Sequence, residues 1–330
     1  MIGSNPYIQL IFGMIILIIS GDYLVKGGVE LARKFKISTL IVGSTVVAMG
    51  TSAPELIVSL KSAIMGHTQM AIGNVVGSNI SNIALVLGFT AIIMAIPVKS
   101  ETLKVGWPTL FIATILFILL GRDSEISRLD GIVLTTTLIL YIVVSIKSSM
   151  KSKEASEIIE AKYPTWKSIA IIILSCIGLT LGSNNLIGGA SEIAKGLGIS
   201  ERIISVTIIA IGTSLPELTA SVMAALRGET DISIGNIIGS NIFNILGVLG
   251  ITATIHPVNV AVNKFHYDFS YMFVLTMILI IFLYPISRNR KYFKNKEYLV
   301  GITNLKGGVL TRTEGTILVL AYCYYIFSIL

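Results

Sequence analysis

The chain has 330 residues, of which 53% are hydrophobic and only 13% are charged, and its formal net charge is +7. Soluble domains carry about 25% charged residues, so the composition excludes an ordinary soluble protein, and we assign the basic excess to loops at a membrane surface rather than to nucleic-acid binding. Two isolated cysteines, Cys176 and Cys323, exclude a disulfide framework and a cysteine metal site.

Apolar runs recur along the whole chain, each long enough to cross a hydrocarbon core about 30 Å thick. No basic residue precedes the first run, which we therefore interpret as a mature first helix and not as a signal peptide. In chain order, we predict helices at residues 7–32, 39–65, 70–96, 104–121, 128–147, 166–195, 201–226, 232–255, 267–286 and 312–330. The predicted fold class is an all-α polytopic membrane protein with ten transmembrane helices.

The second predicted helix is broken by the sequence GTSAPE, which starts at Gly50. Pro54 has no N–H to donate to the carbonyl of Gly50, four residues earlier. An unpaired carbonyl in lipid costs several kcal/mol, so such a break persists only where protein, water or an ion satisfies it. Thr51, Ser52 and Glu55 stand beside the break, and oxygens of these kinds are the ligands that hard cations such as Ca²⁺ prefer.

The seventh predicted helix repeats this break. Residues 50–88 align with residues 212–250 without a gap, and more than half of the aligned positions are identical. The second copy reads GTSLPE, and it supplies Gly212, Thr213, Ser214, Pro216 and Glu217. An intramembrane glutamate is by default a functional-site hypothesis. Because the costly break occurs twice, we interpret both breaks as functional.

The helix after each break carries a second duplicated motif, GNVVGSNISN in the first half and GNIIGSNIFN in the second. Its glycines have the GxxxG spacing that permits close approach of helices; they are Gly73, Gly77, Gly235 and Gly239. Its neutral oxygens stand four residues apart and therefore share a helix face; they belong to Ser78 and Asn82, and to Ser240 and Asn244.

The predicted helices divide the chain into two halves of five, at residues 1–147 and 166–330, joined by a short cytoplasmic linker at 148–165. An odd number of spans forces the second half to enter the membrane from the opposite side. The result is a pair of inverted-topology repeats, with helices 2 and 7 broken, as in many secondary transporters. Lys and Arg gather on the linker side, so we expect a cell-membrane protein with both termini extracellular.

The remaining charges in the predicted helices are expected to have structural roles. Asp22 and Lys26 lie four residues apart on the first helix and are expected to pair with each other. Glu30 and its counterpart Glu192 lie near helix ends, where we expect solvated or snorkelling side chains.

The paired GTSxPE and GNxxGSNI motifs resemble the two α-repeats of the sodium/calcium exchanger family of cation/Ca²⁺ antiporters, and the resemblance covers essentially the whole chain. It implies a minimal, prokaryotic-type core in which Glu55 and Glu217 face each other at the membrane centre. The calcium ligands that it implies are Thr51, Glu55, Thr213 and Glu217. The sodium ligands that it implies are the Ala48 carbonyl, Thr51, Ser52, Glu55 and Ser78, and the Ala210 carbonyl, Thr213, Ser214, Glu217 and Ser240.

The resemblance implies antiport of Na⁺ against Ca²⁺ by alternating access, with no cofactor and no enzymatic reaction. Two glutamates present about two negative charges, which one Ca²⁺ or two Na⁺ neutralise, and the third Na⁺ that the family implies would make exchange electrogenic. Potassium-dependent relatives carry an aspartate where this chain has Asn244, which argues against potassium co-transport.

Other functions remain open at this point. A Ca²⁺/H⁺ antiporter or a potassium-dependent Na⁺/Ca²⁺ antiporter would use the same glutamates, and a cation channel could also contain duplicated broken helices. The hydroxyls beside each break favour Na⁺, and enclosed carboxylates suit alternating access better than a channel. The expected partners are Ca²⁺, Na⁺ and the lipid bilayer, with no nucleic acid or protein partner and a functional monomer.

Overall fold

The structure is a computed structural model that describes residues 5–99, 101–150, 161–204, 207–208, 210–284 and 308–329. Within these residues the fold is helical apart from two short strand pairs. Among the described residues seven helices are long and apolar enough to cross a membrane, or eight if one bent pair is counted as a single span. The prediction of an all-α polytopic membrane protein is confirmed.

The first half of the chain begins with the long helix α1 (Pro6–Phe35). The second span consists of α2 (Thr39–Val42), the π-helix η1 (Gly43–Val47), α3 (Ala48–Thr51) and α4 (Ala53–Ile64). The third consists of α5 (Thr68–Ser81), the π-helix η2 (Asn82–Leu87) and α6 (Gly88–Ile93). Then follow β1 (Ile96–Pro97), η3 (Thr102–Gly106), α7 (Trp107–Leu120), η4 (Gly121–Asp123), β2 (Glu125–Ile126) and α8 (Arg128–Met150).

The second half repeats this order, beginning with α9 (Thr165–Gly196). Its broken span contains α10 (Glu201–Ile204), α11 (Ala210–Thr213) and α12 (Leu215–Leu226). The next consists of α13 (Thr230–Ile242), the π-helix η7 (Phe243–Leu249) and α14 (Gly250–Ile255). Then follow β3 (Val258–Asn259), α15 (Val262–Leu283), β4 (Val309–Leu310) and α17 (Arg312–Ile329).

The predicted helices agree with these elements wherever their residues are described. The largest difference is at α15, which starts at Val262 and not at residue 267. The division of the chain at 148–165 stays a prediction, because α8 continues to Met150, α9 starts at Thr165, and residues 151–160 lie outside the described part.

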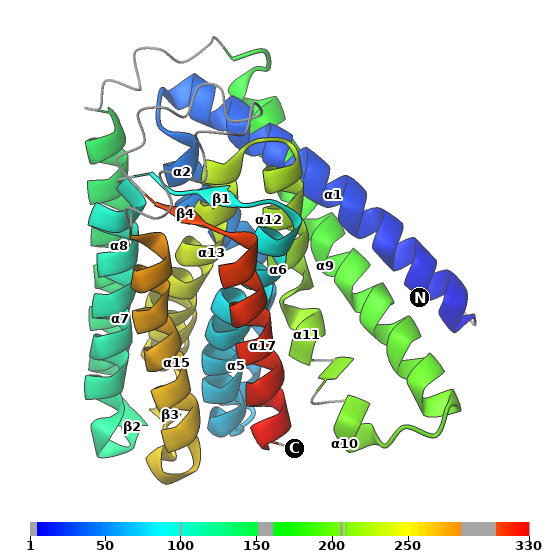
Figure 1. Cartoon of the computed structure of the whole chain (residues 1–330). Coiled ribbons are helices and arrows are strands. Elements are labelled where there is room, and N and C mark those ends of the chain that lie inside the picture. Colours follow the sequence, from blue (N-terminus) through cyan, green and yellow to red (C-terminus); the bar gives the residue numbers. More distant parts are fainter. Residues whose placement is uncertain are drawn as a thin grey trace.

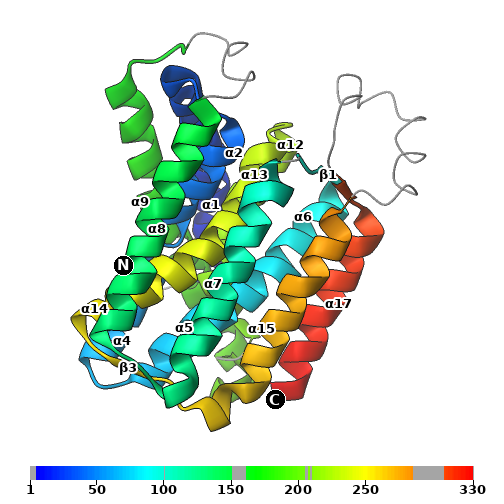
Figure 2. The same cartoon turned by 90° about the vertical axis from the view of Figure 1, so that its left-hand side faces the viewer.

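The helices form a central group with a slanted pair at one side (Figure 1). The pair is α1 and α9, which run antiparallel, since Gly13 lies against Leu186 and Gly27 against Ile172. The span that starts with α13 is almost entirely buried, which places it at the centre. Helices α8, α7, α15 and α17 stand side by side along the opposite face (Figure 2).

The two strand pairs tie the halves together at opposite ends of the molecule (Figure 1). In the antiparallel pair β1–β4, Ile96 lies opposite Leu310, and in β2–β3, Ile126 lies opposite Val258. The N-terminal end of α1 lies at about mid-height at the outer edge of the slanted pair, and the C-terminal end of α17 lies near the end that holds β2–β3 (Figure 1).

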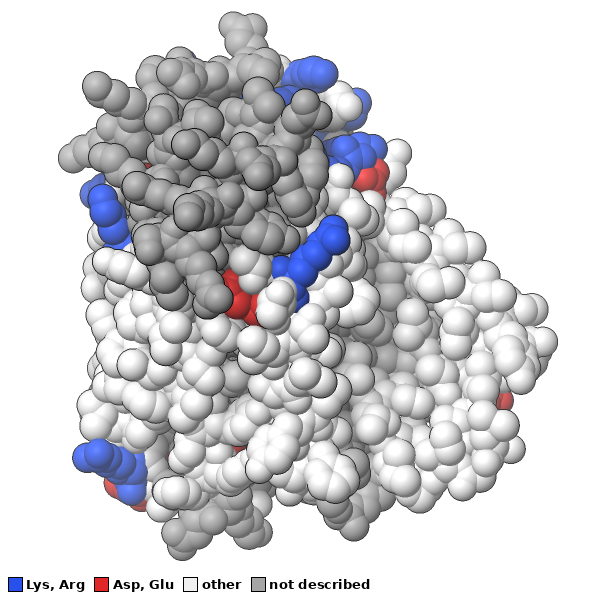
Figure 3. All heavy atoms as spheres, viewed as in Figure 1, with Lys and Arg blue, Asp and Glu red and all other residues white. Residues whose placement is uncertain are grey.

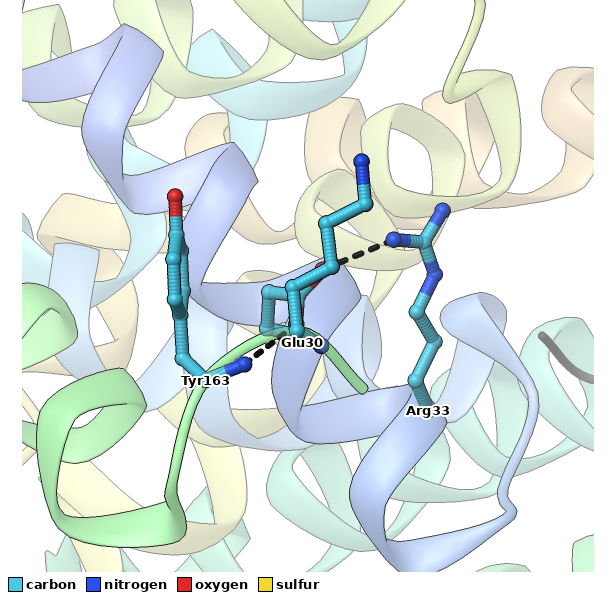
Figure 4. A network of polar contacts seen from close by, with 4 residues as sticks. Glu30, Arg33 and Tyr163 are labelled. Carbon is cyan, nitrogen blue, oxygen red and sulfur yellow. Dashed lines mark hydrogen bonds and ion pairs between the residues drawn. The ribbon is translucent and has the colours of Figure 1, made fainter. Parts of the chain in front are cut away.

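The expectation of a solvated Glu30 is wrong, because its side chain is only 5% exposed. Its carboxylate accepts hydrogen bonds from Arg33 Nη1 at 2.7 Å and from the backbone N–H groups of Lys162 at 2.5 Å and Tyr163 at 3.2 Å (Figure 4). These donors replace water and join the end of α1 to the segment that leads into α9. The counterpart Glu192 is exposed, as expected.

The expected ion pair on α1 is confirmed, with 2.8 Å between Lys26 Nζ and Asp22 Oδ2. Asp22 also pairs with Arg227, which follows α12. Asp22 therefore links α1 to the central helices, a contact between elements that spacing along one helix does not reveal.

Candidate functional site

Both breaks have the same backbone geometry. Ser52 has φ −89° and ψ 9°, and Ser214 has φ −90° and ψ 6°, a sparsely populated region in which many active-site residues lie. Pro54 and Pro216 occupy the second position of the helix that follows, where a proline is tolerated. The axis bends by 45° at the first break.

Helix α9 covers the glycine of each break. A Cβ atom added to Gly50 would lie 2.3 Å from Cys176 Sγ, and one added to Gly212 would lie 2.3 Å from Ile187 Cγ1. A Cβ at either position would therefore require the neighbouring side chain on α9 to move. The Gly212 carbonyl, which Pro216 cannot pair, accepts a hydrogen bond of 2.7 Å from Ser183 Oγ on α9. Protein atoms thus satisfy one of the two freed carbonyls.

Glu55 and Glu217 are the two carboxylates of the site, with 2% and 0% of their surface exposed. Ser52 Oγ donates a hydrogen bond of 2.9 Å to Glu217 Oε1, so the break of the first half lies against the carboxylate of the second. Oε2 of each glutamate is buried and has no hydrogen-bond partner. These two oxygens are acceptors without donors in the described part of the chain.

Thr51 also connects the two halves. Its hydroxyl donates toward Asn236 Oδ1 at 3.1 Å and toward the Ala48 carbonyl at 3.2 Å, and it lies 3.4 Å from Ser240 Oγ. Three of the sodium ligands implied by the resemblance, Ala48, Thr51 and Ser240, therefore lie together with Asn236, which sequence reasoning did not single out.

The other predicted ligands lie on α5, on α11 and at the second break. Ser78 on α5 and Ser214 at the second break are buried, and Ser214 Oγ has no hydrogen-bond partner among the described residues. Ala210 and Thr213 are the first and last residues of α11, and the Thr213 side chain is half-buried.

The two central asparagines lie at the start of matching π-helices. Asn82 is the first residue of η2, and Asn244 is the second residue of η7. π-Helical turns are rare in proteins, and many of those that occur lie at functional sites. Both amide atoms of Asn82 and Oδ1 of Asn244 are buried without a partner, while Asn244 Nδ2 donates to Asn79 Oδ1 at 3.5 Å. These neutral oxygens add to the unpaired acceptors.

The GxxxG glycines behave differently in the two halves. A Cβ at Gly235 would lie 2.6 Å from the Leu40 carbonyl oxygen, and one at Gly239 would lie 2.4 Å from that of Ser44, so α13 touches the backbone of α2 and η1. A Cβ at Gly73 would lie 3.6 Å from Phe265, and at Gly77 no described atom would lie within 4 Å.

Four further residues support the site and were missed. Asn74 Nδ2 donates to the Glu55 carbonyl at 3.2 Å and to Ser59 Oγ at 2.8 Å. Asn236 Nδ2 makes the same bonds in the second half, to the Glu217 carbonyl at 3.3 Å and to Ser221 Oγ at 3.0 Å. All four lie at matching positions of the duplicated stretch, which was the signal that could have identified them.

The electrostatic character of the site follows from these contacts. None of the described ion pairs involves Glu55 or Glu217. Burial of an unpaired carboxylate costs several kcal/mol, and two of them repel each other. Within the described residues no group of three His, Cys, Asp or Glu side chains could hold a metal ion. The arrangement therefore offers two carboxylates and several neutral oxygens, a set suited to Ca²⁺ or Na⁺.

Comparisons with known proteins agree with this chemistry. The chain is 37% identical over 332 residues to the putative antiporter CaxA of Alkalimonas amylolytica. This alignment covers 97% of this chain and 98% of the relative. It is 30% identical over 319 residues to the sodium/calcium exchanger MaX1 of Methanosarcina acetivorans, covering 84% of this chain and 91% of the relative.

The fold is similar to that of a solved structure of the sodium-calcium exchanger NCX_Mj, with a TM-score of 0.79, 29% sequence identity and 97% of each chain covered. The family model described as "Sodium/calcium exchanger protein" matches residues 5–147 and 167–330. These matches extend over both halves of the molecule and over both breaks. The chain belongs to the sodium/calcium exchanger family.

Proposed function

We propose that this protein exchanges Na⁺ for Ca²⁺ across the membrane and that both ions bind in turn between Glu55 and Glu217. The observation that carries the proposal is the pair of buried Oε2 atoms without hydrogen-bond partners, in a site that Ser52 closes across the two halves. The names of MaX1 and NCX_Mj, two sodium/calcium exchangers, support the same activity.

The proposed ligands are those that the duplicated motifs supply. Ca²⁺ would be held by Thr51, Glu55, Thr213 and Glu217, because carboxylates provide the charge that a divalent ion needs. Na⁺ would also use the neutral oxygens. These belong to the Ala48 and Ala210 carbonyls and to Ser52, Ser78, Ser214 and Ser240.

Alternating access follows from the charge of the site. The empty site holds about two negative charges, and enclosing them away from water is unfavourable. One Ca²⁺ or two Na⁺ would remove that penalty, so the transporter would change conformation only when loaded. A third Na⁺ would leave one positive charge and make the exchange electrogenic.

Potassium is not expected to take part in transport. Asn244 is fully buried and offers an oxygen without a charge. An added K⁺ would therefore bring a positive charge with no carboxylate to balance it, and the penalty grows as the local dielectric constant falls. Ca²⁺ uptake driven by Na⁺ is thus proposed to proceed in the absence of K⁺.

The proposed orientation places the end of the molecule that holds β1–β4 in the cytoplasm of the cell. Lys and Arg gather mainly toward that end of the face shown in Figure 3, above a broad uncharged band. The last turn of α1 contributes Arg33 and Lys34 there. Under the positive-inside rule both termini would then be extracellular. We also propose that the two inverted halves form one functional monomer.

Replacement of either glutamate by glutamine tests the proposal. Glu55→Gln and Glu217→Gln each remove about half of the negative charge at nearly constant volume, so we expect Na⁺-driven ⁴⁵Ca²⁺ counterflow in proteoliposomes to fall below a tenth of wild type. Thermal denaturation in detergent would check that the variants fold. Near-normal uptake by both folded variants would overturn the proposal.

Separate ion gradients test the alternatives in the same vesicles. Saturable counterflow under a Na⁺ gradient with K⁺ replaced by choline is the expected result. Uptake driven only by a pH gradient would identify a Ca²⁺/H⁺ antiporter, and an absolute requirement for K⁺ would overturn the assignment of Asn244. Single-channel currents would instead identify a cation channel.

A further inference from the structure

We propose that Asn236 is a positioning residue that sets the preference of the site for Na⁺ relative to Ca²⁺, by accepting the hydrogen bond of the Thr51 hydroxyl. The inference rests on the proposed function and assigns a role to a side chain that is no proposed ion ligand. Asn236 lies on α13 in the second half, whereas Thr51 ends α3 in the first, so the contact joins the two repeats.

The hydrogen bonds of Asn236 fix the orientation of its amide. Nδ2 has two acceptors on its side, the Glu217 carbonyl at 3.3 Å and Ser221 Oγ at 3.0 Å. A flipped amide would place Oδ1 against the Glu217 carbonyl, where two acceptors would repel each other. Oδ1 therefore faces Thr51 Oγ1 at 3.1 Å. The side chain is fully buried, so water does not compete for this contact.

The Thr51 hydroxyl has a single proton, and its nearest acceptors are Asn236 Oδ1 at 3.1 Å and the Ala48 carbonyl at 3.2 Å, with Ser240 Oγ farther away at 3.4 Å. A hydroxyl that binds a cation must present its lone pairs to the ion and direct its proton elsewhere. When Asn236 accepts the proton, Thr51 Oγ1 and the Ala48 carbonyl are both available to a cation. Without Asn236 the nearest remaining acceptor is the Ala48 carbonyl, so we expect the Thr51 hydroxyl to donate its hydrogen bond there and to occupy that carbonyl.

The two ions depend on these oxygens to different degrees. In the proposed ligand sets, Na⁺ uses both the Ala48 carbonyl and Thr51, whereas Ca²⁺ uses Thr51 together with two carboxylates. Loss of the proton acceptor should therefore weaken Na⁺ binding more than Ca²⁺ binding. Residues that orient a metal ligand typically change metal affinity 10- to 100-fold when they are replaced.

The experiment compares Asn236→Leu and Asn236→Ala with Ser221→Ala in proteoliposomes. Ser221→Ala removes one acceptor of Nδ2 but keeps Oδ1 beside Thr51, so it controls for a merely structural contact between α13 and α12. Ca²⁺/Ca²⁺ exchange, which needs no Na⁺, measures the half-saturating Ca²⁺ concentration and shows that each variant is folded. Na⁺-driven Ca²⁺ counterflow measures the half-saturating Na⁺ concentration.

We expect the Asn236 variants to raise the half-saturating Na⁺ concentration about 10-fold or more and the Ca²⁺ value by a clearly smaller factor. Ser221→Ala should leave the ratio of the two values close to that of wild type. Equal factors for both ions, no change in either, or the same shift in Ser221→Ala would overturn the inference. Absence of Na⁺-driven counterflow in the wild type would instead overturn the proposed function.

Discussion

Helices α5 and α13 carry the same GxxxG motif, and among the described residues their glycines have different neighbours. Around Gly235 and Gly239, α13 touches the backbone of the opposite broken span, whereas no described atom lies within 4 Å of a Cβ at Gly77. The residues that correspond to the partners of α13 are 202–206, of which 205 and 206 lie outside the described part. In the described residues the motif therefore brings α13, but not α5, into backbone contact with a broken span.

The largest expected effect is that of Gly239→Ala. The new Cβ would lie 2.4 Å from the Ser44 carbonyl oxygen, a backbone atom that cannot rotate away. Overpacking of this kind costs about 3 kcal/mol, which we expect as a loss in the free energy of unfolding measured by SDS titration. An unchanged value would show that α13 does not approach η1 this closely.

Gly77→Ala is the matched variant in the first half and sharpens the comparison. We expect it to leave the free energy of unfolding within about 0.5 kcal/mol of wild type, as for a substitution without close contacts. If the halves exchange their packing during transport, Gly77→Ala should still slow Ca²⁺ counterflow. A normal rate together with normal stability would mean that the difference between α5 and α13 is permanent.

A second difference separates the buried Glu30 from the exposed Glu192. Glu30→Ala removes charge-assisted hydrogen bonds from Arg33 Nη1 and from two backbone N–H groups. Because hydrogen bonds to charged groups contribute about 2 kcal/mol, we expect a loss of that size in the free energy of unfolding. Glu192→Ala should change it little, and equal losses in both variants would contradict this difference between the halves.

The smallest loss of stability expected for a variant that removes a described contact is that of Ser183→Ala, which removes the donor to the Gly212 carbonyl. Loss of one hydrogen bond to a buried acceptor costs about 1 kcal/mol. Ser191→Ala is the control on the same helix, because Ser191 Oγ is buried without a partner and its loss should be neutral or slightly stabilising. The thermal denaturation midpoint of Ser183→Ala should therefore be lower than that of wild type. The midpoint of Ser191→Ala should be equal to that of wild type or slightly higher.

Sequence reasoning identified the features that a linear pattern can carry. The apolar runs predict the helices, because a span of lipid requires a minimum length. The duplicated Gly, Pro and Glu residues predict where the helices break. Ser52 and Glu217 nevertheless form a hydrogen bond across the halves that no spacing along one chain segment could reveal.

The missed residues share one physical property: each has at least one partner on another element. Asn236 belongs to a motif that the repeat makes conspicuous, but its contact with Thr51 depends on the close approach of α13 to η1. Ser183 and Glu30 have no such motif, because the corresponding residues are Gly21 and the exposed Glu192. A repeat alignment therefore finds what the halves share and misses what only one of them needs.

The contact between Cys176 and Gly50 places a native thiol beside the first break. The sulfur occupies the space that a side chain of residue 50 would fill, so a displacement of α9 along the broken span would change the surroundings of the thiol. The chain has one other cysteine, Cys323, which is exposed on α17 and can be replaced by serine. A difference between the rates at which a maleimide labels Cys176 in Na⁺ and in Ca²⁺ would then report movement of α9 without an engineered probe.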